Sequence, residues 1–409
     1  MARVVLSGYY GFHNAGDEAM LRAILDALES RIPRLSVTVL SADPFHTRRE
    51  HGVDAIGRMD LARIYSRLRQ ADLFISGGGS LLQDVTSDRT LAYYLGLLSL
   101  ARSLGRRTMV YGQGIGPLRS TVGRALARWV LDRVGLITVR DEASVQELVG
   151  LGVTRPRVVL AADPVLGLNL PRGPEEGARI LAEEGVGADG RPLVGVALRP
   201  WPNARGFERV LAAAVDHLTQ ALGVEAVFLC LQLPQDLEVS KRVAALLRRP
   251  ARVLHRRYGP HQIMSILSRL ELVVGVRLHA LVFAAMMNVP FLGLAYDPKI
   301  DGFLHSLGME PAASLESLRL EDLLFRLEQA WRGRAALRRR LKAAVPGLRA
   351  LSLKSADLAA EMLGFGAAAG SSEGAAGEAP GGAEGAAGEG PGEAAGGAVE
   401  RRAGAAGSG

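Results

Sequence analysis

The residues most able to do chemistry gather in the segment 275–299, at the ends of two apolar runs. Arg277 and His279 follow the run 272–274, and Lys299 follows the run 291–296. Because the carboxyl ends of neighbouring parallel strands meet at one edge of a sheet, we expect these three side chains to share a crevice. Three cationic or protonatable groups in one place indicate a small, multiply charged anion as ligand. The alternative is that Arg277 and Lys299 are solvated and His279 caps its helix.

A second candidate site follows the first predicted strand, residues 3–7. The turn 8–18 is rich in glycine but does not have the GxGxxG spacing, so it predicts no dinucleotide site. Its glycines allow backbone amides to approach a ligand, and the predicted helix 19–31 points its positive end at the same place. Asn14 and Asp17 are the polar candidates here, and either of them could instead be the N-cap of that helix.

Two further strand ends carry chemically suitable residues. Gly77, Gly78 and Gly79 follow the apolar segment 73–76, and three consecutive glycines are hard to explain by packing alone. They suit close contact between the backbone and a phosphate or a sugar. Arg140 follows the predicted strand 136–139 and adds a fourth cation at a strand's carboxyl end.

The repeated order of strand, glycine-rich turn and helix predicts an α/β fold with two doubly wound, Rossmann-like domains facing a central cleft, as in GT-B enzymes. We predict an acceptor-side domain at residues 1–169, a linker at 170–190 and a donor-side domain with C-terminal helices at 191–363. Residues 364–409 are almost wholly Gly, Ala, Glu, Ser and Pro, and this composition predicts a disordered tail.

Composition narrows the possible partners and the compartment. The single cysteine excludes a disulfide framework, and no His, Asp and Glu set has the spacing of metal ligands. The net charge is +7, and without the acidic tail it becomes +11, which favours anionic substrates or an anionic membrane surface. Aromatic residues make up only 5% and no nucleic-acid recognition motif is present, so we expect no nucleic-acid partner. The absence of a secretory signal or a spanning helix predicts a cytoplasmic protein.

Six segments in order give the chain a family resemblance. It resembles the polysaccharide pyruvyl transferases, and within them the CsaB type, in the segments GYYGFHNAGDEA, FISGGGSLLQD, YGQGIGP, ITVRDEAS, GVRLHA and AYDPK. The resemblance implies a GT-B-like fold, phosphoenolpyruvate as donor substrate and no cofactor. It also implies an N-acetylmannosamine acceptor on a polyprenyl-diphosphate-linked cell wall precursor, and a 4,6-pyruvate ketal as product. Members of this type modify the polymer that anchors surface-layer proteins, at the inner face of the membrane.

The same resemblance implies roles for the candidate residues. Arg140, His279 and Lys299 would bind the carboxylate and phosphate of the donor, and we add Arg277 to this set. Asp17 and His279 are the candidates for general acid and general base. Asn14 would orient one of the reacting partners.

Two other functions compete with this hypothesis. A GT-B glycosyltransferase or epimerase that binds a nucleotide sugar is the nearest, although such enzymes usually hold the ribose and sugar with a pair of glutamates that is missing beside His279 and Lys299. A non-catalytic sugar- or anion-sensing module is the other, and the cluster of titratable groups argues against it. For contact with a membrane, the predicted helix 120–134 offers Arg124 and Arg128 one turn apart, with Trp129 beside them.

Overall fold

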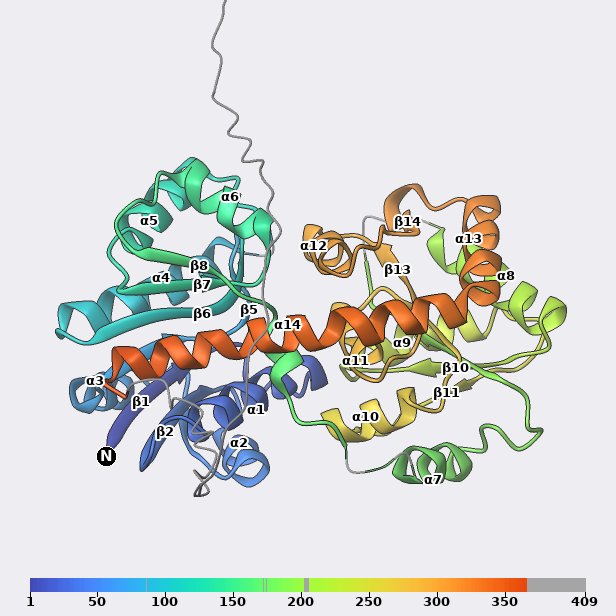
Figure 1. The fold of residues 1–409 in the computed structure, drawn as a ribbon, viewed down its shortest axis with the longest axis horizontal. Coiled ribbons are helices and arrows are strands. Elements are labelled where there is room, and N and C mark those ends of the chain that lie inside the picture. Colours follow the sequence, from blue (N-terminus) through green and yellow to red (C-terminus); the bar gives the residue numbers. More distant parts are fainter. Residues whose placement is uncertain (86, 172, 174, 202–205, 366–409) are drawn as a thin grey trace, which may run out of the picture. The chain divides into compact units, whose positions relative to one another are not determined.

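The computed structural model describes residues 1–85, 87–171, 173, 175–201 and 206–365, and it contains two parallel β-sheets (Figure 1). The eight-stranded sheet has the order β3-β2-β1-β4-β6-β7-β8, with β5 paired to β6, and the six-stranded sheet has the order β11-β10-β9-β12-β13-β14. We call the parts that carry these sheets the first and the second half. In each half the strand order reverses beside the first strand, which is where doubly wound folds bind ligands.

The elements of the first half alternate strictly between strand and helix up to β4, where β5 interrupts the order. They are β1 (Ala2–Ser7), α1 (Ala15–Glu29), β2 (Leu35–Ser41), α2 (Pro44–His51), β3 (Asp54–Gly57), α3 (Leu61–Gln70), β4 (Leu73–Ser76), β5 (Gly79–Leu82), α4 (Asp88–Ser103), β6 (Arg107–Ile115), α5 (Thr121–Leu131), β7 (Leu136–Val139), α6 (Glu142–Leu151), β8 (Arg157–Leu160) and the 3₁₀ helix η1 (Pro164–Gly167).

The second half repeats this alternation and ends in two helices. Its elements are α7 (Glu175–Glu183), β9 (Leu193–Ala197), α8 (Phe207–Ala221), β10 (Glu225–Leu229), α9 (Gln235–Ala244), β11 (Arg252–Val253), α10 (Pro260–Leu267), β12 (Leu272–Gly275), α11 (Leu278–Met286), β13 (Phe291–Ala295), α12 (Pro298–Ser306), β14 (Ala313–Ser314), the 3₁₀ helix η2 (Leu315–Ser317), α13 (Leu320–Arg332) and α14 (Arg334–Met362).

The helices nearest the candidate site begin where short polar side chains satisfy free backbone amides. The Asp141 carboxylate accepts from the amide of Ser144 at the start of α6, and the Asp297 carboxylate accepts from the amide of Lys299 at the start of α12. Pro298 follows Asp297, and proline is favourable at this first helical position because its missing N–H would have no partner there. The polar residues at these strand ends therefore fix the entry of the following helices.

A continuous apolar core joins the two halves. It includes Leu6 and Met20 of the first half and Leu281 and Phe283 of the second, all of them almost completely buried. The helix α14 contributes Leu358 to this core and contacts α1, η1 and β6 as well as α11 and α13, so it lies against both halves (Figure 1). The outer faces of the two sheets are covered by separate cores.

The segment predicted as a linker, 170–190, includes the helix α7, whose apolar residues pack against α10. The C-terminal helical region divides at Gly333 into α13 and α14. The helix α14 continues through Pro346. An interior proline costs about 3 kcal/mol, and here the helix is held on both sides of it by buried residues such as Leu341 and Leu358.

Near the site, the helices begin earlier than the sequence pattern indicates. The helix α1 begins at Ala15 rather than at residue 19, so Asp17 lies in its first turn. The helix α11 begins at Leu278, so His279 lies inside it. The short elements α2, β5 and α12 are not apparent in the sequence pattern. The predicted disorder of the tail concerns residues that lie almost entirely outside the described part of the chain, and the predicted domain boundaries at 169 and 191 stay predictions.

Candidate functional site

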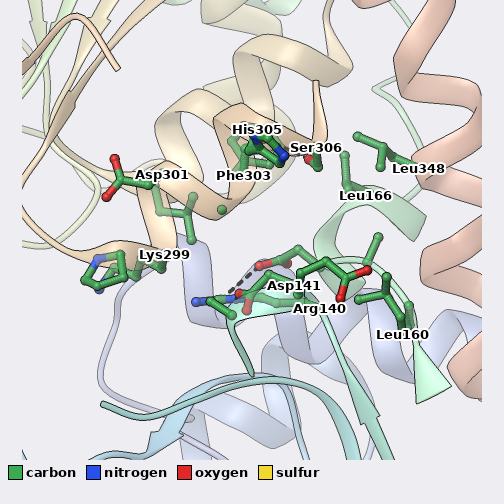
Figure 2. Close-up of a pocket in the computed structure, with 18 of the residues that line it drawn as sticks. Arg140, Asp141, Leu160, Leu166, Lys299, Asp301, Phe303, His305, Ser306 and Leu348 are labelled. Atoms are coloured by element: carbon green, nitrogen blue, oxygen red, sulfur yellow. Dashed lines mark hydrogen bonds and ion pairs between the residues drawn. The ribbon is translucent and has the colours of Figure 1, made fainter. Parts of the chain in front are cut away.

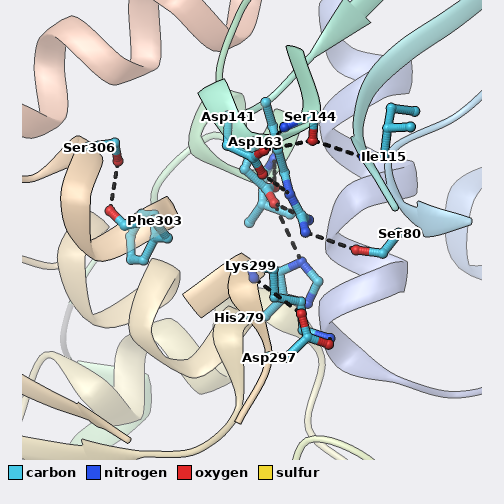
Figure 3. Close-up of polar contacts among 12 residues, drawn as sticks. Ser80, Ile115, Asp141, Ser144, Asp163, His279, Asp297, Lys299, Phe303 and Ser306 are labelled. Atoms are coloured by element: carbon cyan, nitrogen blue, oxygen red, sulfur yellow. Dashed lines mark hydrogen bonds and ion pairs between the residues drawn. The ribbon is translucent and has the colours of Figure 1, made fainter. Parts of the chain in front are cut away.

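The predicted residues lie at strand ends that meet between the two halves. Asp17 follows β1, Arg140 follows β7, His279 follows β12 and Lys299 follows β13. Figure 3 shows Asp163, Ser80 and Asp297 among them, linked by ion pairs and hydrogen bonds. The side chains therefore come from both sheets and meet at their carboxyl edges, as the sequence pattern predicts.

Asp17 carries a carboxyl whose pKa is raised from its usual acidic range to about 7. Burial is the main cause and the neighbouring Glu18 carboxylate adds to it, while Arg277 and Lys299 act in the opposite direction. The open side of Gly79 faces this carboxyl, because a Cβ built at Gly79 would lie 4.0 Å from Asp17 Oδ1. A carboxyl with this pKa can donate a proton near neutral pH, which an ordinary exposed aspartate cannot.

Asn14 is the N-cap of α1. Its Oδ1 accepts from the amide of Gly16 at 3.1 Å, and its backbone pairs with Gln232 of the second half in an isolated antiparallel bridge. The next amide, of Ala15, donates to the carbonyl of Leu231 at 2.9 Å. Of the two residues that could cap this helix, Asn14 is therefore the cap and Asp17 is the one left for chemistry.

His279 lies against the first turn of α1 and beside Asp163. Its Nε2 is 4.0 Å from Asp163 Oδ2 and is buried without a hydrogen-bond partner in the described structure. Glycine is needed at position 16 because a Cβ there would collide with the His279 ring. Burial lowers the pKa of His279 to about 4, against the opposing effect of Asp163, and Arg140 and Lys299 lower it further. The imidazole is therefore neutral at physiological pH and able to accept a proton.

Arg140 is buried and holds three partners. Its side chain is only 5% exposed, and it donates to Asp163 Oδ2 at 3.1 Å, to Ser80 Oγ at 2.9 Å and to Asp141 Oδ2 at 3.4 Å (Figure 3). Asp163 also accepts from the amide of Val165 through Oδ1 and so caps η1. One carboxylate of the first half thus lies between Arg140 and the second half's His279.

The other two predicted cations are also paired with carboxylates. Arg277 forms a two-pronged ion pair with Asp236, which is completely buried, and donates to Gln232 Oε1 at 3.1 Å. Lys299 Nζ lies 3.1 Å from Asp297 Oδ2. The alternative that Arg277 is solvated is therefore wrong. A bound anion would have to compete with these carboxylates for the cations.

The three glycines after β4 are required by different local structure. A Cβ at Gly77 would collide with the Tyr10 hydroxyl, and a Cβ at Gly78 would collide with Met20 Sδ. Packing therefore explains these two, which corrects the expectation that packing is insufficient. Gly79 has a φ of +97°, which favours glycine, and its open side faces Asp17. Of the three, Gly79 is the one placed to approach a substrate.

A cavity of about 650 Å³ opens beside Arg140 and Lys299 and is lined by both halves (Figure 2). The apolar side chains of Leu160, Leu166, Phe303 and Leu348 form much of its wall. A second cavity, of about 580 Å³, is also lined by both halves, and its lining includes His13, Asp43, Arg49, Cys230, Arg257 and Tyr258. The predicted cleft between the halves is thus present as two cavities, and Ala15 and Glu18 of α1 line the second of them.

Sequence analysis missed Asp163 and Ser80 as members of this site. Asp163 shortly follows β8 and Ser80 shortly follows β4, so the strand-end argument that selected Arg140 applies to both. In the described part of the chain we find no group of three or more His, Cys, Asp or Glu side chains arranged to hold a metal ion. Nor does any described helix have the length and apolar character to cross a membrane.

The fold defines the class of the protein. Two doubly wound sheets with a cleft between them make a GT-B-like enzyme fold, and solved structures agree. The Staphylococcus aureus MnaA–UDP structure has a TM-score of 0.66 at 10% identity, over 89% of this chain and 98% of that one. Anabaena HepE in complex with UDP-glucose has a TM-score of 0.64 at 15% identity, over 89% of this chain and all of that one. The predicted fold class is confirmed.

The family is shown by sequence. The model of the family described as polysaccharide pyruvyl transferase matches residues 14–298, and the chain belongs to this family. It is also 21% identical over 381 residues to the amylovoran biosynthesis protein AmsJ of Erwinia amylovora, covering 77% of this chain and 89% of that protein. The family membership that the six segments predicted is confirmed, and with it pyruvyl transfer to a polysaccharide.

Proposed function

We propose that this enzyme transfers the pyruvyl group of phosphoenolpyruvate to an N-acetylmannosamine residue, forming a 4,6-ketal and releasing phosphate. The observation that carries the chemistry is the presence near Asp163 of two buried groups, Asp17 with a pKa of about 7 and His279 with a pKa of about 4. A protonated acid and an unprotonated base coexist between these two values. This is the pair that addition of a hydroxyl group across the donor's double bond requires.

Their pKa values also favour one assignment of roles. Asp17 gives its proton to the methylene carbon of the donor, which becomes a methyl group and leaves C2 electrophilic. A sugar hydroxyl attacks C2 while His279 takes its proton. Phosphate then leaves with the proton that His279 took from the first hydroxyl. The second hydroxyl attacks C2 to close the ketal, and its proton returns to the Asp17 carboxylate, so both residues end in the protonation states in which they began.

Arg140 and Lys299 suit the donor's anionic groups because both lie at the wall of the 650 Å³ cavity. Lys299 is the more accessible, with 20% of its side chain exposed against 5% for Arg140. We assign Lys299 a direct contact with the donor that displaces Asp297. Arg140 retains its ion pair with Asp163 and donates its other N–H groups to the substrate. Arg277 adds positive charge at the carboxyl edge of the second sheet.

The acceptor and its location follow from the CsaB-type resemblance. We propose a polyprenyl-diphosphate-linked cell wall precursor, modified by a cytoplasmic enzyme at the inner face of the membrane, for the polymer that anchors surface-layer proteins. No cofactor is needed in this scheme, because the phosphoenolpyruvate itself supplies the activated group.

Incubation with phosphoenolpyruvate and a synthetic disaccharide acceptor containing N-acetylmannosamine tests the proposal. We expect the acceptor to gain the mass of one pyruvate less one water, with one phosphate released for each ketal formed. An acceptor with N-acetylglucosamine in the reacting position is the matched control for acceptor identity. If turnover occurs with UDP-sugars and not with phosphoenolpyruvate, the donor assignment is wrong and the nucleotide-sugar hypothesis replaces it.

A further inference from the structure

A further cation of the second half, Arg199, lies at the position where this fold binds ligands. It follows β9 (Leu193–Ala197), and β9 and β13 both pair with β12, one on each side. Arg199 Nη1 donates to the hydroxyl of Tyr296, the residue after β13, at 2.6 Å. This hydrogen bond therefore spans the carboxyl end of β12, next to the start of α11 and His279.

The Arg199 guanidinium is held on aromatic rings. Its central carbon lies 4.8 Å from the ring centre of Tyr296 and 5.7 Å from that of Trp201. Its Nε is buried and has no hydrogen-bond partner in the described structure. Stacking on an aromatic ring fixes the plane of a guanidinium and leaves its N–H groups free to bind in that plane.

Arg199 differs from Arg140, Arg277 and Lys299 because no carboxylate of the described residues pairs with it. The carboxylate of Glu316 accepts a hydrogen bond from Trp201 Nε1, at 3.4 Å, and forms no ion pair with Arg199. A partly buried guanidinium with a donor left unsatisfied is unfavourable unless an anion meets it. Lys299 Nζ lies 5.2 Å from the centre of the same Tyr296 ring, so two cations flank one tyrosine at this edge.

We propose that Arg199 forms an anion subsite, set in place by Tyr296, that binds a phosphoryl group of the substrate. A planar guanidinium pairs with phosphate through two parallel hydrogen bonds, and Lys299 adds a second positive charge beside it. Resting on the proposed function, the ligand is the phosphate of phosphoenolpyruvate. The subsite itself requires only a phosphoryl group, so its test can be separated from the identity of the donor.

Direct binding tests the subsite without turnover. The dissociation constants of phosphoenolpyruvate, UDP and inorganic phosphate are measured by calorimetry for the wild type, Arg199→Gln and Tyr296→Phe. The control is Arg334→Gln, because Arg334 also stacks on an aromatic ring, 4.3 Å from the centre of Trp331, but far along the chain on α14. Thermal unfolding of each variant shows whether it is folded.

We expect Arg199→Gln to weaken phosphoenolpyruvate binding by about 10- to 100-fold, Tyr296→Phe by a few-fold, and Arg334→Gln not at all. If the wild type binds UDP or phosphate but not phosphoenolpyruvate, and Arg199→Gln weakens that binding, the subsite stands and the donor assignment fails. If Arg199→Gln binds the preferred anion like the wild type, or if the wild type binds none of the three, the subsite is overturned. Should Arg199→Gln fail to fold, Tyr296→Phe decides, and unchanged binding there overturns the proposal.

Discussion

The two halves contribute different kinds of chemistry to one edge. In the proposed mechanism the first half supplies the acid, Asp17, in the first turn of a helix, where burial raises its pKa. The second half supplies the base, His279, also in the first turn of a helix, where burial lowers its pKa. Burial removes charge in both cases, but it turns the carboxyl into a proton donor and the imidazole into a proton acceptor. The difference between the two residues thus comes from the chemistry of the buried group, a carboxyl in one half and an imidazole in the other.

We expect the largest effect on kcat when the titratable proton of Asp17 is removed by substitution. Asp17→Asn keeps the size of the side chain and removes its titration, so we expect kcat to fall by roughly 10²–10⁴-fold while donor binding changes little. Steady-state kinetics with phosphoenolpyruvate, together with calorimetry for binding, measure both quantities. Glu29→Gln, at the other end of α1, is the control. Activity close to that of the wild type would show that Asp17 is not the acid.

The second largest effect is expected for the two cations that are proposed to bind the donor, one from each half. Arg140→Ala and Lys299→Ala should each lower kcat/KM for the donor by at least about tenfold, because a lost charge-assisted hydrogen bond costs about 1.5–3 kcal/mol. Arg67→Ala removes a surface ion pair with Asp54 and serves as the control. If both site variants retain wild-type kinetics and are folded, neither residue binds the donor.

The pH dependence separates the acid from the base. The proposed mechanism needs Asp17 protonated and His279 unprotonated, so we expect kcat/KM to fall about tenfold per pH unit above about pH 7 and below about pH 4. The alkaline limb belongs to Asp17 and should disappear from the residual activity of Asp17→Asn. An alkaline limb that survives this substitution would assign the group with the higher pKa to another residue.

The positions of the site residues at strand ends could be predicted from the sequence, but their pairing with one another could not. Apolar runs ending at Arg140, His279 and Lys299 placed these side chains at strand ends because parallel sheets leave little choice. The sequence could not show that Arg140 and Arg277 already pair with carboxylates, since Asp163 and Asp236 reach them from distant parts of the chain. Arg199 does not stand out in the sequence because its position depends on Tyr296, 97 positions away. Pairing across the fold decides which cation is available, and spacing along the chain does not.

Stability should change in the opposite direction to activity at Asp17. Its folded-state pKa of about 7 lies above the ordinary value of 3.8, so the native protein loses stability as pH rises from about 4 to about 7. Asp17→Asn should therefore be more stable than the wild type at pH 8, by up to about 4 kcal/mol and with a higher Tm, and about equal to it at pH 3.5. Calorimetric scans at both values measure this. A variant that is less stable at pH 8 would contradict the burial of a charge at this position.

The smallest expected effect concerns membrane contact at α5. The structure corrects the predicted contact: Arg124 donates to Glu147 and to the carbonyls of Leu118 and Gly150, so it is held within the protein. The exposed face of α5 instead carries Val122 and Trp129, which are 76% and 50% exposed, with the guanidinium of Arg133 stacked 5.2 Å from the Trp129 ring centre. An exposed tryptophan flanked by arginine is typical of a helix at the lipid headgroups.

Vesicle sedimentation measures this contact. We expect the wild type to bind anionic but not neutral vesicles and to be released at high salt, because each basic residue near such a surface contributes about 1 kcal/mol. Trp129→Gln with Arg128→Glu should weaken binding by roughly tenfold, whereas Phe325→Gln, which changes an equally exposed hydrophobic residue on α13, should not. Equal loss in both variants would mean that nonspecific hydrophobic exposure drives the binding. No loss in the α5 variant would exclude this helix, and Arg338, Arg339 and Arg340 on α14 would then be the basic cluster to test.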